Sequence, residues 1–529
     1  MNAPNLGALP RRKLPIGLRS FAKLRAEDHY YVDKTGLVID LIESGAYYCL
    51  SRPRRFGKSL LLDTFKALFE GERSLFTGLT AEMRWDWTRR HPVIRIDFGS
   101  GVLQSRAELD QRLHEILLDV QRDLGLPDPV GHDSVTGQFA ELIRLAHVKF
   151  GATVVVLINE YDKPILDNIA DRATATVMRD GLRNLYSVLK GADAHLKFVF
   201  ITGVSKFSKV SLFSGLNNLF DITLEARWSA LCGYTDDDLD TVFAPELPGL
   251  DREEIRRWYN GYNWGGTSVY NPFDALLLFK TREFKPYWFE TGTPTFLVDM
   301  LTSRHWYTPD LSRTVATETL LSAFDVDRIE AEALLFQAGY LTVDSVWAIP
   351  GRKEYTLKYP NKEVQASLND SLLRVLTGGA RISEPQVSRL YRLLQAQDVA
   401  GLRDLFHAFF ASIPHDWYRT NDIARFEGYY ASVFYSHFAA LGLDIRVEDT
   451  TNHGRIDMAV EFGSAVWIFE FKVVELMPEG KALQQIKDRG YADKYLGHSG
   501  SVHLVGVEFS RNSRNIVGFE TETLTPSTA

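Results

Sequence analysis

The feature that most constrains the fold is a continuous apolar run from Val154 to Ile158, made mainly of β-branched residues. Branched Cβ atoms favour extended backbone, because they restrict the side chain in a helix. A strand without polar alternation is covered on both faces, as in parallel sheets flanked by helices. A second such run, Phe198 to Thr202, follows a helical pattern at 173–190. Strands separated by helices predict an α/β fold with a doubly wound parallel sheet.

The segment Gly57-Lys58-Ser59 lies between a short strand pattern that ends at Leu50 and a helical pattern from Leu60 to Phe69. This order is typical of a phosphate-binding loop. Backbone amides at the helix start bind phosphate, the lysine reaches the β- and γ-phosphates, and the hydroxyl binds Mg²⁺. The tripeptide alone is common, and a surface turn explains it equally well. The motif is also partial, because its first glycine is expected at the position of Arg52.

A second NTPase signal follows the run at Val154, where Asn159 and Glu160 occur. NTPases place a Mg²⁺-binding carboxylate and a residue that activates the attacking water at such a strand end. Asn159 brings no charge, so we expect weak Mg²⁺ binding and doubtful ATP turnover. Glu160 is the expected general base, and a carboxylate in a surface loop is the alternative. Thr202 ends a neighbouring strand and is expected to contact the γ-phosphate, unless that strand simply continues into a loop.

The sequence therefore predicts an ATP site with Mg²⁺ at the carboxyl ends of the parallel strands. The residues expected to bind the nucleotide are Arg54, Arg55, Phe56, Gly57, Lys58, Ser59, Leu60, Asn159 and Thr202, with Ser59 as a metal ligand.

A second candidate centre lies near the C-terminus, in the segment Phe469-Glu470-Phe471-Lys472. Alternation along a strand places Glu470 and Lys472 on one face and the two phenylalanines on the other. Asp457 begins the preceding strand pattern and is expected opposite Glu470. Two carboxylates on neighbouring strands suit Mg²⁺ or Mn²⁺, and a nearby lysine can position water or stabilise charge on phosphate. The alternative is a solvated Glu–Lys salt bridge, which does not explain Asp457.

Three further residues are expected to support this centre. Glu427 lies on the helix predicted at 423–441 and could add or orient an acidic ligand. Gln485 and Tyr491 lie on the helix predicted at 481–495, within reach of a metal-bound water or a nucleic-acid backbone. The whole chain carries a net charge of −8, so nucleic acid would require a local basic groove.

In combination, the motifs resemble those of the predicted AAA-ATPase-like family of bacteria and archaea. The segments that carry this resemblance are Leu14-Pro15-Ile16-Gly17, Tyr31-Val32-Asp33-Lys34-Thr35, Arg52-Pro53-Arg54-Arg55-Phe56-Gly57-Lys58-Ser59, Glu160-Tyr161-Asp162-Lys163-Pro164, Thr202-Gly203-Val204-Ser205-Lys206-Phe207-Ser208, Ser214-Gly215-Leu216-Asn217-Asn218-Leu219 and Trp258-Tyr259-Asn260-Gly261-Tyr262. The tail, with Gly454-Arg455-Ile456-Asp457 and Phe469-Glu470-Phe471-Lys472, is similar to the PD-(D/E)XK nuclease domain that this family carries.

The resemblance implies an AAA+-like P-loop ATPase fused to a nuclease-fold domain. It also implies that Arg52 is a family habit, that the family has Asp where this chain has Asn159, and that the chain forms a homo-oligomer in which a neighbour supplies an arginine to the nucleotide. Four parts are expected: an ATPase core at 1–230, an aromatic-rich lid at 231–290, a mostly helical linker at 291–420 and a nuclease-like domain at 421–529.

Composition limits the class of protein and the compartment in which it is expected. The 529 residues include only two cysteines, Cys49 and Cys232, which excludes a disulfide scaffold and a four-cysteine zinc site. No run approaches the ~20 apolar residues of a membrane span, and the first ten residues lack the apolar core of a signal peptide. A cytoplasmic protein without a membrane partner is expected.

The leading hypothesis is an ATP-regulated, Mg²⁺-dependent nuclease that cleaves DNA in defence against foreign genetic elements. Glu160 would serve ATP turnover, and the centre around Glu470 would cleave. The alternative is an ATP-binding signalling switch whose nuclease-fold domain is a non-cleaving interaction module. A translocase is a third interpretation, but no series of helicase-like motifs occurs in the sequence.

Overall fold

The computed structural model describes residues 10–127, 134–205, 212–213, 216, 218–288, 311, 314–322, 324–325, 328–376, 380–412, 427–451, 454–495 and 500–525. The chain divides into two compact units. The first unit comprises Met1–Thr291 and Thr314–Asn361, and the second comprises Gly292–Arg313 and Lys362–Ala529. Among the described residues, no helix has the length and apolar character needed to cross a membrane.

A five-stranded parallel sheet forms the centre of the first unit, in the order β2-β3-β4-β1-β5. The strands are β1 (Tyr47–Ser51), β2 (Val93–Asp97), β3 (Val154–Asn159), β4 (Leu196–Gly203) and β5 (Phe220–Asp221). Every residue of β3 is buried, as its unbroken apolar run predicts. Because the strands are parallel, the carboxyl ends of β1 to β4 meet at one edge of the sheet.

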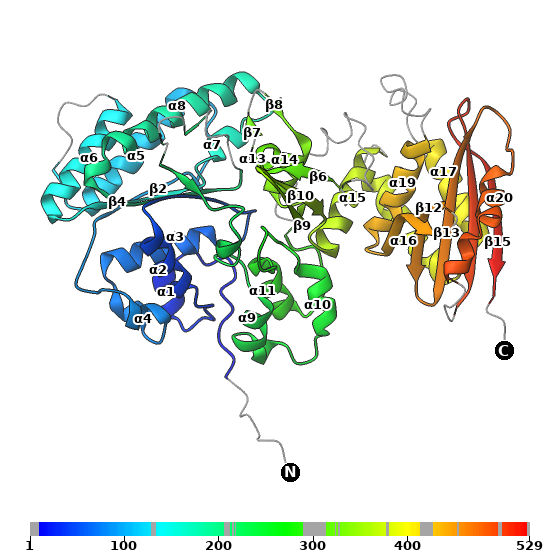
Figure 1. Ribbon diagram of the computed structural model, residues 1–529, viewed down its shortest axis with the longest axis horizontal. Coiled ribbons are helices and arrows are strands. Elements are labelled where there is room, and N and C mark those ends of the chain that lie inside the picture. Colours follow the sequence, from blue (N-terminus) through cyan, green and yellow to red (C-terminus); the bar gives the residue numbers. More distant parts are fainter. Residues whose placement is uncertain are drawn as a thin grey trace, which may run out of the picture. The chain divides into compact units, whose positions relative to one another are not determined.

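Helices cover both faces of this sheet (Figure 1). One face carries α1 (Phe21–Ala26), α2 (Thr35–Ser44), α3 (Lys58–Glu70) and α4 (Thr80–Arg84). The other carries α5 (Arg106–Asp123), α6 (Val135–Phe150) and α8 (Arg172–Gly191), while the short α7 (Lys163–Leu166) follows β3. The predicted doubly wound α/β fold is therefore confirmed.

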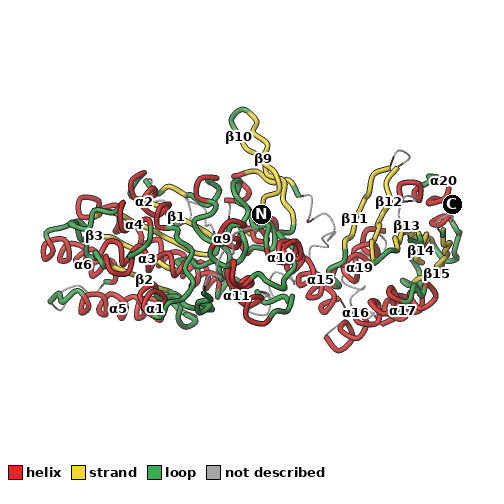
Figure 2. Tube along the Cα trace, turned by 90° about the horizontal axis from the view of Figure 1, so that it is seen from below, coloured by secondary structure: helices red, strands yellow, loops and turns green. Residues whose placement is uncertain are grey.

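The remainder of the first unit combines short helices with a small antiparallel sheet, β6-β10-β9. Its elements are α9 (Asp236–Thr241), α10 (Arg252–Tyr259), α11 (Pro272–Thr281), β6 (Val315–Thr317), α13 (Glu318–Ser322), β7 (Phe324–Asp325), β8 (Arg328–Ile329), α14 (Ala331–Ala338), β9 (Thr342–Ile349) and β10 (Arg352–Lys358). Figure 2 shows β9 and β10 as a hairpin that projects from this unit. Of these strands, only the one near residue 342 is predicted from the sequence.

The aromatic residues of 231–290 pack into a core of their own, in which Tyr259 and Tyr270 are fully buried. Tyr30 and Val32 from the N-terminal segment join this core, and the Tyr30 hydroxyl donates to Glu246 at 3.0 Å. The N-terminal segment is thus anchored beside the region predicted as a lid. The finer division of the chain into four parts stays a prediction.

The second unit has a five-stranded sheet in the order β11-β12-β13-β14-β15, antiparallel except for the β13/β14 pair. Its elements are α15 (Lys362–Leu376), α16 (Ala380–Gln395), α17 (Val399–Ser412), α19 (Glu427–Ala440), β11 (Asp444–Thr451), β12 (Gly454–Phe462), β13 (Ala465–Val474), α20 (Lys481–Asp488), β14 (Val502–Ser510) and β15 (Ile516–Leu524). Figure 1 shows α16, α17 and α19 on one face and α20 on the other.

Two sequence expectations for this unit need correction. The helix predicted at 481–495 ends at Asp488, and a separate 3₁₀ turn, Tyr491–Tyr495, follows. Gly490 lies between them with a φ of 58°, a left-handed conformation that ends a helix. The last strand, β15, has no counterpart in the prediction. The range 291–420, expected to be mostly helical, contains helices α15 to α17 and also strands β6 to β10.

Candidate functional site

The loop between β1 and α3 ends as a phosphate-binding loop is expected to end. Gly57 has a φ of 85° and directly precedes Lys58, the first residue of α3. Glycine adopts this left-handed conformation without strain. No side chain caps the helix start, so its amides, at the positive end of the helix dipole, are left for an anion.

Arg52 fills the position where the usual motif has its first glycine, and its side chain is buried. The guanidinium donates to the backbone carbonyls of Ser51, Thr223 and Trp228 and lies 3.9 Å from the centre of the Trp264 ring. Burial lowers the pKa of Arg52 to about 10, which still leaves it charged at neutral pH. Arg52 therefore fastens the loop to the following segment of the unit instead of facing a ligand.

A cavity of about 400 Å³ opens at this loop, within the ~300–1,000 Å³ usual for small-molecule sites. Of the predicted residues, it is lined by Arg54, Arg55, Phe56, Gly57, Lys58, Ser59, Leu60 and Glu160. Asn159 and Thr202 do not line it. The Thr202 hydroxyl donates to the Leu50 carbonyl at 2.9 Å, so contact of Thr202 with the γ-phosphate stays a prediction.

The cavity lining is rich in cations. Six of them line it, namely Arg19, Lys34, Arg54, Arg55, Lys58 and Lys163, against the carboxylates Glu160 and Asp162. Lys34 pairs with Asp238, and Lys163 pairs with Asp167. Within the described part of the chain, Arg19, Arg54 and Arg55 have no carboxylate partner. An excess of unpaired cations favours an anionic ligand.

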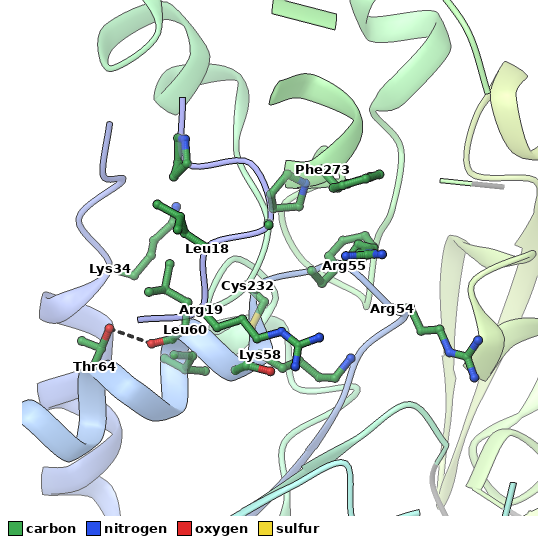
Figure 3. Close-up of a pocket in the computed structure, with 18 of the residues that line it drawn as sticks. Leu18, Arg19, Lys34, Arg54, Arg55, Lys58, Leu60, Thr64, Cys232 and Phe273 are labelled. Carbon is green, nitrogen blue, oxygen red and sulfur yellow. Dashed lines mark hydrogen bonds between the residues drawn. The ribbon is translucent and has the colours of Figure 1, made fainter. Parts of the chain in front are cut away.

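Figure 3 shows how these side chains lie. Arg19 and Lys58 point into the same space, Arg55 lies by Phe273, and Arg54 points away. The Arg55 guanidinium is 4.7 Å from the centre of the Phe273 ring. Sequence reasoning missed Arg19 as a site residue. Gly17, with a φ of 72°, lies in the turn that precedes Arg19, and both residues line the cavity.

Lys58 is buried, and its ammonium donates to the carbonyls of Arg52 and Pro53, both at 2.8 Å. Burial lowers the pKa of Lys58 to about 8, against the opposing charges of Asp162 and Glu160. A phosphate would offer this ammonium a charged acceptor in place of two neutral carbonyls, and charge-assisted hydrogen bonds are the stronger kind.

The structure brings Ser59 and Asn159 together, as the sequence predicts. The Asn159 side-chain nitrogen donates to Ser59 Oγ at 3.1 Å. The same nitrogen lies 3.1 Å from each carboxylate oxygen of Asp97, which ends the adjacent strand β2. Sequence reasoning missed Asp97, because nothing in the sequence shows that β2 pairs with β3.

Two acidic residues follow β3. Glu160 lines the cavity with a φ of 52°, a conformation rare outside glycine and frequent at functional sites. Asp162 is buried and accepts the amides of Val204 and Ser205. Burial raises the pKa of Asp162 to about 6. Asp162 is a second cavity residue that the predicted site lacks, although it lies in the motif that carries the resemblance.

The centre in the second unit is assembled across β12 and β13. Met458 pairs with Phe469 in the antiparallel register, which puts Asp457 opposite Glu470 as predicted. The Phe471 amide donates to Asp457 at 2.8 Å. Lys472 donates to Glu470 Oε1 at 3.1 Å and to the Phe471 carbonyl at 2.9 Å. The phenylalanines at 469 and 471 pack into the core on the other face.

Glu470 is the least expected feature of this centre, because a carboxylate is costly to bury. Its side chain is 1% exposed. Oε1 accepts from Lys472 and Gln485, whereas Oε2 has no hydrogen-bond partner among the described residues. Burial, and then the charge of Asp457, raise the pKa of Glu470 to about 7, while Lys472 opposes the shift.

An open, buried carboxylate oxygen beside a second carboxylate fits a hard divalent cation. Within the residues that the structure describes, no group of three or more His, Cys, Asp or Glu side chains could hold a metal. Asp457 and Glu470 would thus need carbonyl, phosphate or water oxygens to complete the shell. Mg²⁺ is usually bound in this way, by one or two carboxylates plus substrate phosphates and water.

Glu508 on β14 holds α20 against the sheet. Its Oε2 accepts the amides of Glu479 and Gly480, at 2.5 and 3.1 Å, and its Oε1 accepts those of Lys481 and Ala482, at 2.7 and 3.3 Å. A carboxylate that takes four amides at a helix start fixes that helix firmly. Glu508 therefore positions Gln485, one turn further along α20, beside Glu470. No pattern in the sequence indicates this role of Glu508.

The other predicted accessory residues lie differently. Tyr491 is buried in the core beside α20, and its hydroxyl lies so close to Gly454 that an added Cβ would be 2.9 Å away. Glu427 begins α19, but its side chain lies outside the described residues. The lysines of α20 and of the 3₁₀ turn after it are largely compensated. They form the ion pairs Lys481–Glu479, Lys487–Glu522 and Lys494–Asp449.

Comparison with known proteins identifies both units. Residues 15–213 match the family model described as "Predicted AAA-ATPase", and residues 425–519 match that of the "PD-(D/E)XK nuclease superfamily". An Azotobacter chroococcum mcd 1 protein, described as "Uncharacterized protein in vnfD 5'region", is 61% identical over 518 residues, which cover 98% of this chain and 100% of that protein. No solved structure matches the chain significantly. The chain belongs to the family of predicted AAA-ATPases that carry a C-terminal domain of the PD-(D/E)XK nuclease superfamily.

Proposed function

We propose that this protein is an ATP-regulated, divalent-metal-dependent nuclease. The observation that carries the proposal is Glu470, a carboxylate buried beside Asp457 and Lys472 with one oxygen left open. A solvated Glu–Lys salt bridge would not bury the carboxylate or add a second one. The match of this domain to a nuclease superfamily supports nucleic acid as the substrate.

The residues of the second centre divide the work of phosphodiester hydrolysis. Asp457 and Glu470 would hold Mg²⁺ or Mn²⁺, which supplies Lewis-acid stabilisation of phosphate and a more acidic water. Lys472, held by Glu470 and the Phe471 carbonyl, would orient the attacking water or stabilise charge on the phosphate. Gln485 would keep the Glu470 carboxylate in one orientation. Hydrolysis forms a bond between the water oxygen and phosphorus and breaks the bond between phosphorus and the leaving oxygen. The attacking water loses a proton, and the leaving oxygen gains one.

In the first unit, ATP is the proposed ligand of the cavity. Lys58 and the amides at the start of α3 would bind its phosphates, together with Arg19 and Arg55. Ser59 would hold Mg²⁺, and Glu160 would activate water for ATP hydrolysis. DNA as substrate, assembly into a homo-oligomer and a role in defence against foreign genetic elements rest on the family resemblance and are part of the proposal.

The test is a cleavage assay on double-stranded DNA, single-stranded DNA and RNA, with Mg²⁺ or Mn²⁺ and with or without ATP. We expect DNA cleavage that needs the metal and responds to ATP. Lys472→Ala should keep metal binding and lose about 10²–10⁴-fold in rate. A wild-type protein that cuts none of these substrates under any condition would reject the nuclease function.

A second candidate function is an ATP-binding switch with a non-cleaving interaction domain. Asn159 favours it, because an uncharged residue next to Ser59 suits nucleotide binding better than hydrolysis. Tight ATP binding without cleavage of any nucleic acid would support the switch.

A further inference from the structure

We infer that Asp97 supplies the carboxylate for Mg²⁺-bound ATP that Asn159 lacks. The inference rests on the proposed binding of ATP at Ser59. It concerns a position that no motif of the sequence marks, at the end of a different strand from the one that carries Asn159 and Glu160.

The sheet order places Asp97 beside Asn159, behind the cavity residue Ser59. Strands β2 and β3 are parallel neighbours, and Asp97 and Asn159 are register partners at their carboxyl ends. Asn159 in turn reaches Ser59 at the start of α3, with 3.1 Å between the amide nitrogen and the hydroxyl oxygen. Asn159 thus forms a bridge between the hydroxyl expected to bind Mg²⁺ and a carboxylate one strand further along the sheet.

The chemistry of the amide fixes how this bridge is oriented. An ionised carboxylate only accepts hydrogen bonds, so the NH₂ group of Asn159 must face Asp97. It does so at 3.1 Å to both oxygens. Asn159 is fully buried, and its carbonyl oxygen has no hydrogen-bond partner among the described residues. The amide nitrogen thus lies beside the Ser59 hydroxyl and the Asp97 carboxylate, while the amide oxygen stays unpartnered. All three side chains offer oxygen atoms suited to a hard cation.

An acidic residue at position 159 would not fit beside Asp97 in the same way. Two carboxylates at the 3.1 Å separation seen for the amide repel each other, and one of them would be driven to take up a proton. The side chains at positions 97 and 159 would therefore carry one negative charge between them, whether position 159 holds Asn or Asp. In this chain the charge resides on β2 and the neutral partner on β3.

The surroundings leave the Asp97 charge available. Its side chain is 35% exposed, and its contact with Arg95 is 3.4 Å long, whereas Arg95 binds Asp63 at 2.7 Å. The Gly99 amide donates to Asp97 at 2.8 Å. A Cβ on Gly99 would lie 2.9 Å from Asp97 and 3.4 Å from the Glu160 carboxylate. Gly99 therefore lets both acidic groups approach the same point.

The test compares the wild type with Asp97→Asn, Asn159→Asp and the double variant in which the two side chains are exchanged. Calorimetry measures ATP affinity with Mg²⁺ and with EDTA, and the spectrum of bound Mn²⁺ reports the metal directly. In the wild type Mg²⁺ should strengthen ATP binding. Asp97→Asn should lose most of this gain, at least about tenfold in Kd, and keep its affinity in EDTA. The exchanged variant should regain it.

The controls make each outcome decisive. Asp119→Asn removes an exposed carboxylate of α5 that pairs with Arg122 and should leave the effect of Mg²⁺ unchanged. If Asp97→Asn fails to fold, Asp97→Ser replaces it, because serine keeps an acceptor for the Gly99 amide without a charge. An unchanged Mg²⁺ effect in the Asp97 variants, or no recovery in the exchanged variant, would overturn the inference. A wild type that binds no ATP in either condition would instead reject the proposed function of the site.

Discussion

In the first unit Asp97 faces an amide, Asn159, whereas in the second unit Asp457 faces a second carboxylate, Glu470. Each pair joins two neighbouring strands. Asp97 and Asn159 end parallel strands, whereas Asp457 and Glu470 lie within antiparallel strands. The amide satisfies Asp97 by hydrogen bonds at no electrostatic cost. In the second unit, burial and then the charge of Asp457 raise the pKa of Glu470 to about 7, and Lys472 opposes the shift.

The two pairs differ in how their charges are balanced when no metal is bound. A single carboxylate beside a neutral amide meets no like charge, so the first centre needs no cation to offset repulsion between its own side chains. Two carboxylates that share a buried site are a poor arrangement until a cation binds. The second centre is therefore built for metal, and its occupancy should control both its charge and its stability.

The largest effect is expected from breaking the carboxylate pair. Asp457→Ala or Glu470→Ala should remove metal-dependent cleavage, by at least about 10³-fold, because metal coordination supplies several kcal/mol to phosphoryl chemistry. Initial rates on labelled DNA measure the loss, and Glu470→Gln repeats it with the side-chain volume kept. Asp449→Asn is the matched control, since Asp449 lies in the same sheet but pairs with Lys494 and Tyr495. Undiminished cleavage in the alanine variants would move the active site elsewhere.

The next effect tests the first centre alone. Lys58→Met keeps the apolar stem and removes the ammonium, which should weaken ATP binding by about 1.5–3 kcal/mol, or roughly 10–150-fold in Kd. Arg19→Ala should also weaken binding, whereas Arg54→Ala should change it little, because Arg54 points away from Arg19 and Lys58 (Figure 3). Calorimetry at one salt concentration measures the Kd for ATP of the three variants and so ranks their losses in affinity. Equal losses at Arg19 and Arg54 would mean that only bulk charge matters.

A third effect follows from the raised pKa of Glu470. Below about pH 7 the carboxyl is protonated, and a metal must displace that proton, so Mn²⁺ affinity should fall as pH drops from about 8 to about 6. The stability of the metal-free protein should depend on pH in the opposite direction from the Mn²⁺ affinity. A carboxyl whose folded pKa lies above its unfolded value stabilises the fold at low pH, and this contribution is lost as pH rises through about 7.

Two measurements check these signs. Mn²⁺ titrations at several pH values report the affinity, and thermal melting of the metal-free protein reports the stability. Glu470→Gln, which cannot ionise, should melt at a temperature that depends less on pH over this range. A wild type and a Glu470→Gln variant with the same pH dependence would show that Glu470 does not titrate there.

The sequence predicts the individual strand ends well, but not which ends become neighbours. The runs at Val154 and Phe198, and the segment at Glu470, have patterns that depend only on local burial and alternation. The β2/β3 pairing that brings Asp97 to Asn159 depends on the sheet order, which no local pattern encodes. The same holds for Glu508, whose partners are the backbone amides of a helix that lies 26 to 29 positions earlier.

The roles of Arg52 and Arg19 at the phosphate-binding loop and its cavity are equally hard to predict from the sequence. Arg52 breaks a motif that expects glycine, and only the folded unit reveals that its guanidinium binds the carbonyls of Thr223 and Trp228. Arg19 lies far from the phosphate-binding motif in sequence and reaches the cavity because the N-terminal segment is anchored by Tyr30 and Val32. These residues act through contacts between distant segments, where spacing in the sequence carries no information.

The smallest expected effect sharpens the comparison itself. Asn159→Asp would turn the first centre into a carboxylate pair like that of the second. Because Asp97 already provides the charge, Mg²⁺-bound ATP should gain little affinity at about pH 8, no more than a few-fold, or about 1 kcal/mol. One carboxyl of the new pair should then hold a proton more tightly. The Lys58 ammonium, whose pKa is about 8, titrates in both proteins. ATP affinity in Mg²⁺ should therefore fall in the variant relative to the wild type as pH drops to about 6. A large, pH-independent gain would mean that position 159, and not Asp97, is where the metal needs its charge.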